Sequence, residues 1–393
     1  MSDIRVVFSV RFVVRIVVWI AMALIVAAVP VYLETFWLQL GLFICVAVIG
    51  AVGLDLLTGL AGQLSLAHAF FIGVGAYAYA ILAAQPEDGS WGMGLPPLIA
   101  AVLAVAITAS AGVLFSPVAK RLRGLYLGIA TLGLVFIGQF VMLNASPLTG
   151  GTSGRRTPEF TVFGWSFSSG DPAFSLLGVP FERLERLWLL GVVLAVGSVW
   201  VARNLRDSRF GRQLQNIRDS EVAAAVLGVN VQRTKAAVFT VSSAYAGVAG
   251  VLLALTYEQV VPDAFGLDMS ITYTVIIVIG GMGSVTGAAL GAIVVTAIPQ
   301  LLDHFSSVLP FVADTDTQSA FGPTYVSNLI YALLVVAILV FQPRGLSGML
   351  HGLRDWAEVP SRSGNASETP EIVDGAEKND GRRAQDERDR SRL

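Results

Sequence analysis

The chain has 393 residues, of which 54% are hydrophobic and 14% charged, and its mean hydropathy is +0.69. Soluble domains have about a quarter of their residues charged, so this composition excludes an ordinary soluble protein and predicts a polytopic membrane protein. The net charge of -2 identifies no partner, and a single cysteine, Cys45, excludes a disulfide framework and a cysteine-based metal site.

Apolar segments predict about ten transmembrane helices, because one crossing needs roughly 20 apolar residues. The first segment, 16–33, follows three arginines and could mimic a signal peptide, but many similar segments follow, so we interpret it as a retained span. Segment 35–86 is too long for one span and is divided near Thr58 and Gly59. Segments 89–119 and 124–144 supply the fourth and fifth spans.

The second half begins with a long loop, 145–185, which is rich in Gly, Ser and Pro and lacks the pattern of a span. Segments 187–202 and 236–257 follow, with a basic stretch between them. Segment 269–302 would make one helix of about 50 Å, too long for a bilayer core of about 30 Å. We therefore divide it at Gly280, Gly281 and Gly283, and the last span lies within 317–343.

Lys and Arg residues are distributed unequally between the two sides of this arrangement. With the N-terminus inside, the inner segments hold 15 of them and the outer segments hold 4, leaving out the C-terminal tail. The positive-inside rule therefore predicts that both termini are cytoplasmic. The tail 358–393 is charged and poor in apolar residues, which predicts a disordered cytoplasmic segment.

Two glycine-rich breaks, 58–77 and 279–294, each lead into a span of small residues near the third and ninth crossing. Interrupted spans at corresponding positions of two halves are typical of transporters built from internal repeats. Shared Gly and Ala composition would produce the same similarity, so both interpretations stay open.

The stretch 208–235 is the one long polar, basic interruption of the apolar pattern. Its cations could belong to a plain positive-inside loop. It also contains a short helix with an apolar face, which Gly228 ends, and such a face favours docking to a soluble partner. The face and the flanking cations comprise Val222, Val226, Leu227 and Val229, and Arg209, Arg212, Arg218, Arg233 and Lys235.

Sequence motifs for catalysis are absent. No segment matches the ATP-binding loop GxxxxGK[ST], a His-Glu metal pair or GxSxG, and no carboxylate pair lies inside a span. The sequence therefore predicts no catalytic residue, no metal site and no cofactor, and any ATP must be bound by another chain. Asp55 lies near the inner end of its span, which favours an interfacial cap or a partner for a basic loop over a proton carrier.

Polar residues inside the spans have two interpretations. They could line a substrate path, or they could hydrogen-bond to neighbouring helices, which intramembrane polar residues usually do. The candidates for the path are Gln63, Ser65, His68, Thr131 and Gln139. A different set, Gly283, Gly287 and Gly291, repeats every four residues and predicts a flat helix face for close packing.

Six ordered motifs carry a resemblance to a known family. They are GQLSLAHAFFIGVGAYAYAIL, RGLYLGIATLGLVFI, LTGGTSG, DSRFGRQLQNIRDSEVAAAVLGVNVQRTKAAVF, VIGGMGSVTGAALGA and FQPRGL. Together they closely resemble LivM-type permease subunits of branched-chain amino acid ABC importers, from about residue 54 to 345. The resemblance implies an ABC importer permease fold, with a transmembrane domain over 1–357, a cytoplasmic coupling region at 204–235 and an extracytoplasmic loop at 145–185.

The same resemblance implies an inner-membrane protein that pairs with a homologous LivH-like permease, docks two ATPase subunits and receives substrate from an extracytoplasmic binding protein. Nucleic acid is not among the implied partners. A pattern similar to the coupling helix of ABC permeases comprises Arg218, Glu221, Ala223, Ala224 and Gly228. Val222 follows Glu221 where the usual pattern has alanine, and the later Ile-x-Leu-Pro is missing.

The sequence therefore predicts a permease subunit that translocates branched-chain amino acids with energy from separate ATPases. Urea and short-amide permeases of the same family are closely similar, so they remain an alternative. A secondary carrier independent of ATP is a further alternative, but it needs an ion-coupling residue in the membrane, and none is convincing here.

Overall fold

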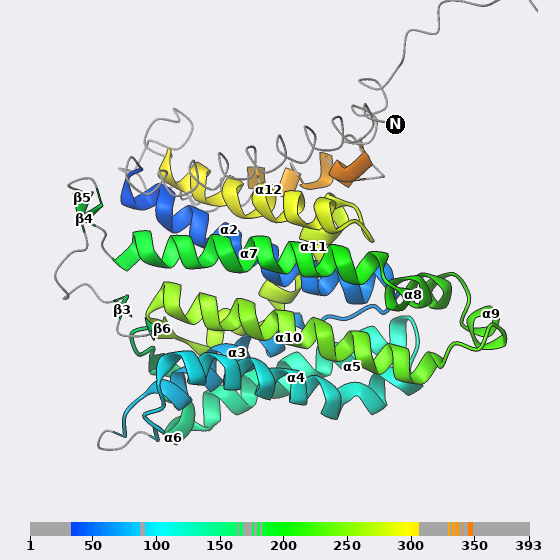
Figure 1. Ribbon diagram of the computed structural model, residues 1–393, viewed down its shortest axis with the longest axis horizontal. Helices are drawn as coiled ribbons and strands as arrows, with labels where there is room; N and C mark the ends of the chain where they lie inside the picture. Colours follow the sequence, from blue (N-terminus) through cyan, green and yellow to red (C-terminus); the bar gives the residue numbers. More distant parts are fainter. Residues whose placement is uncertain are drawn as a thin grey trace, which may run out of the picture. The chain divides into compact units, whose positions relative to one another are not determined.

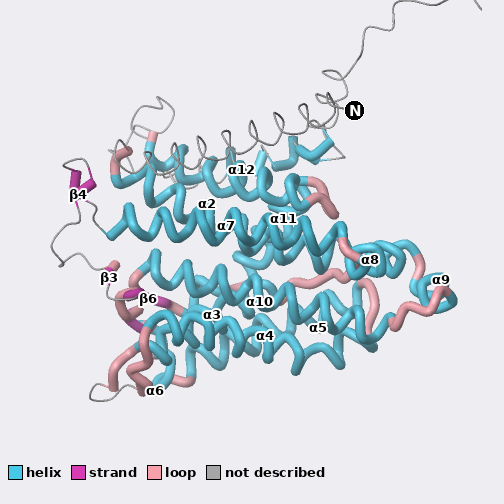
Figure 2. Tube along the Cα trace, viewed as in Figure 1, coloured by secondary structure: helices cyan, strands magenta, loops and turns pink. Residues whose placement is uncertain are grey.

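A computed structural model describes residues 33–86, 91–162, 165–167, 175–176, 179–180, 183–305, 329–330, 332–333, 335–337, 340 and 345–348. Helices make up most of the described chain, and the longer ones run side by side (Figures 1 and 2). The helices are α2 (Thr35–Leu54), a π-helix η1 (Asp55–Leu60), α3 (His68–Ala83), α4 (Pro97–Arg121), α5 (Leu125–Asn144), α6 (Ser146–Thr149), the 3-10 turn η2 (Gly151–Ser153), α7 (Arg183–Asp207), α8 (Arg209–Asp219), α9 (Glu221–Val226), α10 (Val231–Tyr257), the 3-10 turn η3 (Pro262–Phe265), α11 (Leu267–Gly280) and α12 (Val285–His304).

Six of these helices are long and apolar enough to cross a membrane: α2 together with η1, α4, α5, α7, α10 and α12. Two shorter apolar helices, α3 and α11, coincide with two more of the predicted crossings. The all-α, polytopic prediction is confirmed. The predicted first span, 16–33, lies outside the described residues except for Leu33. Of the predicted last span, 317–343, the structure describes only residues 329–330, 332–333, 335–337 and 340, which are helical.

The two short apolar helices both adjoin an interruption of regular helix. Residues 61–67 form a turn and an extended segment before α3, and residues 281–284 form a turn between α11 and α12. The break at Gly281 and Gly283 agrees with the sequence prediction. The other division was predicted near Thr58 and Gly59, but the helix continues through η1 to Leu60. Hydropathy does not reveal this, because Asp55, Thr58 and Gly59 lower the apolar character of η1 without ending the helix.

Close helix packing in the bundle depends on small residues. A Cβ atom at Gly75 of α3 would lie 2.8 Å from the Gly247 Cα of α10, and one at Gly250 would lie 2.1 Å from the Ile72 carbonyl oxygen. Backbones approach this closely only where side chains are absent, as in many membrane helix pairs. Helix α10 packs in this way on α3, and it also contacts α2 and α4.

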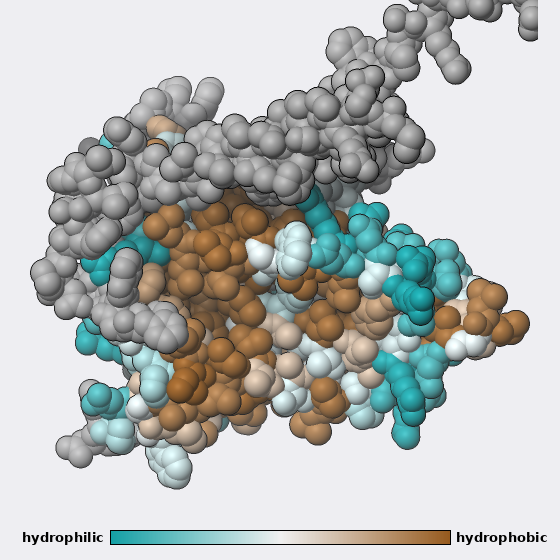
Figure 3. Space-filling model, in the orientation of Figure 1, coloured by the Kyte–Doolittle hydropathy of each residue, from teal (hydrophilic) through white to brown (hydrophobic). Residues whose placement is uncertain are grey.

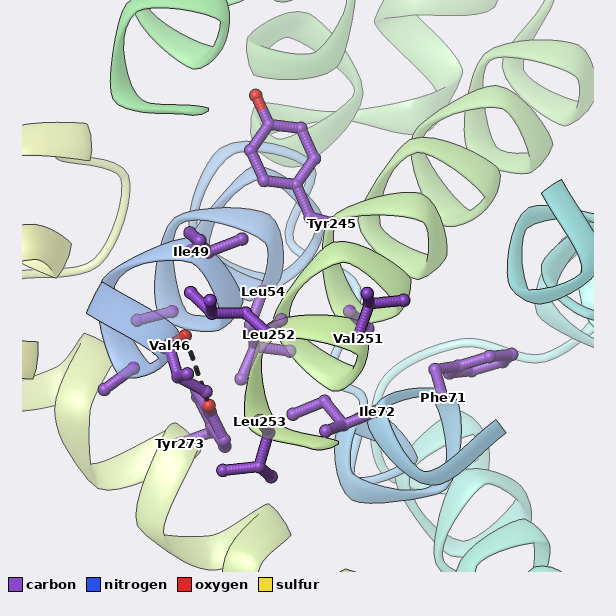
Figure 4. Close-up of a cluster of buried hydrophobic side chains, with 14 of the residues drawn as sticks. Val46, Ile49, Leu54, Phe71, Ile72, Tyr245, Val251, Leu252, Leu253 and Tyr273 are labelled. Atoms are coloured by element: carbon purple, nitrogen blue, oxygen red, sulfur yellow. Dashed lines mark hydrogen bonds between the residues drawn. The ribbon is translucent and has the colours of Figure 1, made fainter. Parts of the chain in front are cut away.

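Larger side chains fill the space between α2, α3, α10 and α11 (Figure 4). Ile49, Ile72 and Leu252 are buried there, and the Tyr273 hydroxyl donates a hydrogen bond to the Val46 carbonyl at 3.5 Å. This cluster joins helices from both halves of the chain. Cys45 of α2 is buried in the same hydrophobic core.

Glycines at the α11–α12 crossing correct one sequence prediction. Gly287 and Gly291 do lie on α12 and face α11, since Cβ atoms there would lie 2.3 Å from carbonyl oxygens of Gly280 and Ile276. Gly283 does not share their helix face, because α12 begins at Val285 and Gly283 lies in the preceding turn at φ 84°. The four-residue spacing in the sequence includes Gly283, which lies before the first residue of α12.

Polar elements gather at the two ends of the described helices. At one end lie three two-residue ladders, in which β1 (Arg155–Arg156) pairs with β6 (Gln259–Val260), β2 (Thr161–Val162) with β3 (Trp165–Ser166), and β4 (Ser175–Leu176) with β5 (Val179–Pro180). Helices α8 and α9 lie at the other end (Figure 1). Hydrophobic residues cover the middle of the visible face (Figure 3). Exposed apolar side chains such as Leu114, Phe140 and Val193 lie on α4, α5 and α7, as expected for a multi-pass membrane protein.

Candidate functional site

Helices α8, α9 and the start of α10 are separated by side-chain caps. Ser208 Oγ accepts a hydrogen bond from the Gly211 N–H at 3.3 Å. Ser220 Oγ accepts one from the Ala223 N–H at 3.3 Å, and Asn230 Oδ1 accepts one from the Arg233 N–H at 3.0 Å. Each cap satisfies a free N–H group in the first turn of its helix, so the basic stretch folds into three helices rather than a plain loop.

Helix α9 presents apolar side chains outward. Val222, Val226 and Leu227 are exposed by 72%, 83% and 72%, whereas Ala224 is 1% exposed. Gly228, at φ 82°, ends the helix, and its N–H donates to the Ala225 carbonyl at 3.0 Å. A protruding six-residue helix with a bare apolar face is a surface suited to a protein partner.

Charged groups hold α9 against the rest of the chain. The Glu221 carboxylate forms an ion pair with the Lys235 ammonium of α10 and a second one, at 2.9 Å, with the Arg123 guanidinium between α4 and α5. The Lys235 side chain is only 4% exposed. Glu221 therefore joins α9 to both α10 and the α4–α5 turn.

Arg218, at the end of α8, reaches the interrupted helices. One of its guanidinium N–H groups donates to the Gly59 carbonyl at 2.5 Å, at the end of η1. Close by, Asp55 Oδ1 accepts a hydrogen bond from the Gly283 N–H at 2.7 Å. The sequence predicted a cap or a basic partner for Asp55; the structure gives it a cap on Gly283, 228 positions along the chain, which no local pattern could indicate.

Extended residues 61–67 alternate between buried and exposed positions, as expected from the two-residue period of an extended chain. Gly62 and Leu64 are exposed, while Gln63 and Ser65 are buried. Both polar atoms of the Gln63 amide are buried and have no hydrogen-bond partner among the described residues. The Ser65 hydroxyl accepts a hydrogen bond from the Ala67 N–H at 3.4 Å.

Thr131 and His68 are also buried. The Thr131 hydroxyl accepts from the Leu66 N–H at 3.0 Å and donates to the Gly128 carbonyl at 2.9 Å, so it joins α5 to the extended segment. The His68 ring packs against the Tyr273 ring with centroids 5.0 Å apart. Its Nε2 atom has no hydrogen-bond partner within the described part of the chain.

The five candidates for the substrate path thus form two groups. Gln63, Ser65, His68 and Thr131 lie around the start of α3, whereas Gln139 is half-buried near η3, where a Cβ at Gly266 would lie 3.4 Å from its amide nitrogen. The hydrogen bonds of Ser65 and Thr131 favour a structural role for these two. A role in the path stays a prediction for all five.

Arg155 is a further buried charged residue, which is not among the predicted site residues. Its guanidinium donates to the Ala80 carbonyl at 3.2 Å, to the Leu148 carbonyl at 2.9 Å and to the Trp91 carbonyl. Burial lowers the pKa of this guanidinium from its ordinary value. The three carbonyls come from separate segments, so Arg155 organises the end of the molecule that carries the strands.

Cavities occur at both ends of the described helices. The larger, of about 1120 Å³, is lined by Arg155, Arg156, Arg183, Glu258 and neighbouring residues. The smaller, of about 190 Å³, lies between the extended segment and α8–α9 and includes Gly62, Arg123, Arg218 and Glu221 in its lining.

Helices long and apolar enough to cross a membrane, two helix interruptions and a protruding helical connection at one end are features expected of a membrane permease. Residues 36–339 match the family described as branched-chain amino acid transport system / permease component. The chain belongs to this family.

Individual relatives agree with this assignment. The chain is 32% identical over 340 residues to the high-affinity branched-chain amino acid transport system permease protein LivM of Salmonella typhimurium, covering 84% of this chain and 74% of the relative. LivM of Escherichia coli K12 is 31% identical with the same coverage. The permease protein LivH of Salmonella typhimurium is 26% identical over 310 residues, covering 76% of this chain and 90% of the relative. No solved structure matches the chain with significant similarity.

Proposed function

We propose that this chain is the membrane permease subunit of an ATP-driven importer that moves branched-chain amino acids across the cell membrane into the cytoplasm. The observation that carries the proposal is helix α9. In a chain of this permease family, α9 is held at its base by the ion pairs of Glu221 and leaves Val222, Val226 and Leu227 exposed.

The proposed partner of α9 is an ATPase subunit. Helices that dock in grooves present apolar anchors on one face, and α9 does this at its tip. Helices α8 and α10 also carry exposed cations, Arg209, Arg212 and Arg233, which favour a partner surface with acidic residues. The end that carries α8 and α9 is then cytoplasmic, in agreement with the predicted charge distribution and cytoplasmic termini. ATP hydrolysis takes place in the partner.

The proposed assembly contains a second permease of the same family and two ATPase subunits, with an extracytoplasmic protein that delivers the substrate. The exposed apolar faces of α4, α5 and α7 leave room for lipid and for the second permease. The opposite end, with the larger cavity and the short strands, then receives the binding protein. Similarity to both LivM and LivH proteins supports pairing of two related permeases.

Uptake of labelled leucine into vesicles containing this chain and its partner subunits tests the proposal. One sample contains a working ATPase, a second contains an ATPase that binds but does not hydrolyse ATP, and a third contains excess unlabelled urea. Uptake that needs hydrolysis and ignores urea supports the proposal. If excess urea abolishes leucine uptake, the substrate is urea or a short amide rather than a branched-chain amino acid. If uptake is the same with the inactive ATPase, the protein is a secondary carrier.

A variant of α9 tests the docking surface separately. Val226→Glu places a carboxylate at the most exposed apolar position, so we expect the ATPase to be lost from the purified complex and uptake to stop. Gln232→Glu introduces the same charge at an exposed position of α10 outside the apolar tip, and it should leave both unchanged. Equal effects of the two substitutions would exclude α9 as the docking helix.

A further inference from the structure

The two helix interruptions meet at one place, which we call the break junction; it comprises Asp55, Gly59, Arg218 and Gly283. A Cβ atom at Gly59 would lie 2.4 Å from the Gly283 nitrogen, and one at Gly283 would lie 3.2 Å from the Gly59 carbonyl oxygen. The backbones of η1 and of the α11–α12 turn are therefore in direct contact. Neither position accommodates a larger residue.

Asp55 links the two breaks. Its side chain is 1% exposed, and Oδ1 holds the Gly283 N–H at 2.7 Å. The same oxygen would be 2.0 Å from a Cβ at Gly59, so this carboxylate lies between the two glycines. The Arg218 guanidinium approaches the same two glycines, because it bonds the Gly59 carbonyl and would lie 2.9 Å from a Cβ at Gly283. A hydrogen bond from a backbone N–H to a carboxylate is a strong, directional link.

Arg218 links the junction to the coupling region. Its Cγ atom would lie 3.2 Å from a Cβ at Gly62, its guanidinium bonds the Gly59 carbonyl, and one guanidinium nitrogen would lie 2.9 Å from a Cβ at Gly283. One side chain of α8 therefore touches both breaks. The Gly59 carbonyl is at the C-terminal end of the α2–η1 helix, where a cation is favoured by the helix dipole and by the free carbonyl groups.

Interrupted segments are where these helices can bend, because regular backbone hydrogen bonding is missing there. Helix α8 directly precedes α9, and only Ser220 separates them. A displacement of α9 therefore moves Arg218, which in turn acts on Gly59 and, with Asp55, on Gly283. Movement at the cytoplasmic end would then reach α2–α3 and α11–α12 together rather than one after the other.

We propose that Asp55 and Arg218 are positioning residues that transmit the movement of the coupling region to both interrupted helix pairs at once. This inference rests on the proposed function, because it needs an ATPase that moves α9. It assigns to Asp55 a role in energy coupling through Gly283, separate from proton transfer and from substrate contact.

The test compares the number of ATP molecules hydrolysed for each leucine imported by the whole complex in proteoliposomes. Asp55→Ala removes the acceptor for the Gly283 N–H, and Arg218→Met removes the donor to Gly59. Each should raise the ratio of ATP hydrolysed to leucine imported at least about tenfold. Asp55→Asn retains an oxygen at Oδ1 and should restore the ratio to within about threefold of the parent.

Asp219→Ala is the matched control, since it removes an exposed carboxylate next to Arg218. Its ratio should equal that of the parent. A purely structural role for Asp55 would lower ATP hydrolysis and import in parallel, leaving the ratio unchanged, and this result would overturn the proposal. If Asp55→Ala prevents assembly of the complex, Arg218→Met decides the question, because Arg218 is exposed and its replacement leaves the buried junction filled.

A second measurement is independent of import. Leu64→Cys places a thiol at an exposed position of the first break, and its rate of reaction with a maleimide is measured with and without ATP and an ATPase trapped in the ATP-bound state. We expect ATP to change this rate at least about threefold in the parent, and Asp55→Ala to abolish the change. An identical change in both would overturn the proposal. If ATP does not drive import by the unsubstituted complex, the proposed function fails as well. If ATP does drive it, a negative result excludes only the proposed role of the break junction.

Discussion

Replacing Glu221 by glutamine removes the carboxylate that lies between two cations and preserves the volume of the side chain. The Lys235 ammonium, whose side chain is 4% exposed, then has no anionic partner among the described residues. Loss of one partner of a fully buried ion pair costs about 3–5 kcal/mol. Lys235 can extend its charge toward water, so the lower end, about 3 kcal/mol, applies here.

Lys235→Met breaks the same ion pair but leaves no buried charge without a partner. It removes the buried ammonium and leaves Glu221, which is 22% exposed, paired with the Arg123 guanidinium, which is 70% exposed. An exposed pair contributes about 1 kcal/mol or less. The two substitutions break the same contact, yet we expect their costs to differ by about 2 kcal/mol, which is roughly 30-fold in an equilibrium constant.

Hydrogen exchange of residues 221–230, followed by mass spectrometry in detergent or nanodiscs, measures this difference. The amides of Ala224 and Val229 report on α9, because they donate to the carbonyls of Ser220 and Ala224 at 3.0 Å each. We expect Glu221→Gln to exchange about 30-fold faster than Lys235→Met. Equal rates, or faster exchange in Lys235→Met, would refute the assignment of Glu221 as the compensating charge.

Three further predictions, each with its own substitutions, are tested by thermal unfolding in detergent. Arg155→Ala removes three hydrogen bonds from a charged group, worth about 1.5–3 kcal/mol each before water replaces part of them, so we expect a loss of about 3 kcal/mol or more. Gly291→Ala places a Cβ 2.3 Å from a carbonyl oxygen of α11 and should lower the free energy of unfolding by about 1–3 kcal/mol. Gly197→Ala is its control, because no neighbouring atom lies within 4 Å of a Cβ there, and it should leave the free energy of unfolding unchanged or raise it. Ser270→Ala removes the acceptor of the Ala69 N–H at 3.1 Å and should cost about 1–3 kcal/mol, with much of this recovered by threonine.

Among the described residues, apolar length predicted the six long helices and the two shorter apolar ones, because a bilayer imposes the same length requirement on each crossing. Charged residues beside the apolar segments did not predict where the helices begin and end. Helix α7 spans Arg183–Asp207 although the prediction gave 187–202, since the helix continues on both sides of the apolar segment with charged residues. Helix α10 likewise begins at Val231 rather than at residue 236. Hydropathy marks the buried part of a helix and not its hydrogen-bonded ends.

The glycine and the apolar pattern around residues 221–228 were sufficient to predict the short helix α9 and the residue that ends it. Gly228 adopts the positive φ expected of a residue that ends a helix, and Ala224 is buried while Val226 is exposed, as a short amphipathic helix requires. A single sequence does not reveal which distant residues meet. The contacts of Asp55 with Gly283 and of Arg218 with Gly59 join positions 228 and 159 apart, and only the packing of the bundle brings them together.

The buried position of Cys45 has a practical consequence for spectroscopy and labelling. The side chain is 7% exposed within α2, and it is the one cysteine of the chain. A thiol introduced at an exposed position, such as 64 or 226, would therefore react with a fluorophore or spin label far faster than the native one. The natural sequence already serves as a background for site-directed probes, without the removal of cysteines that so often weakens membrane proteins before the experiment begins.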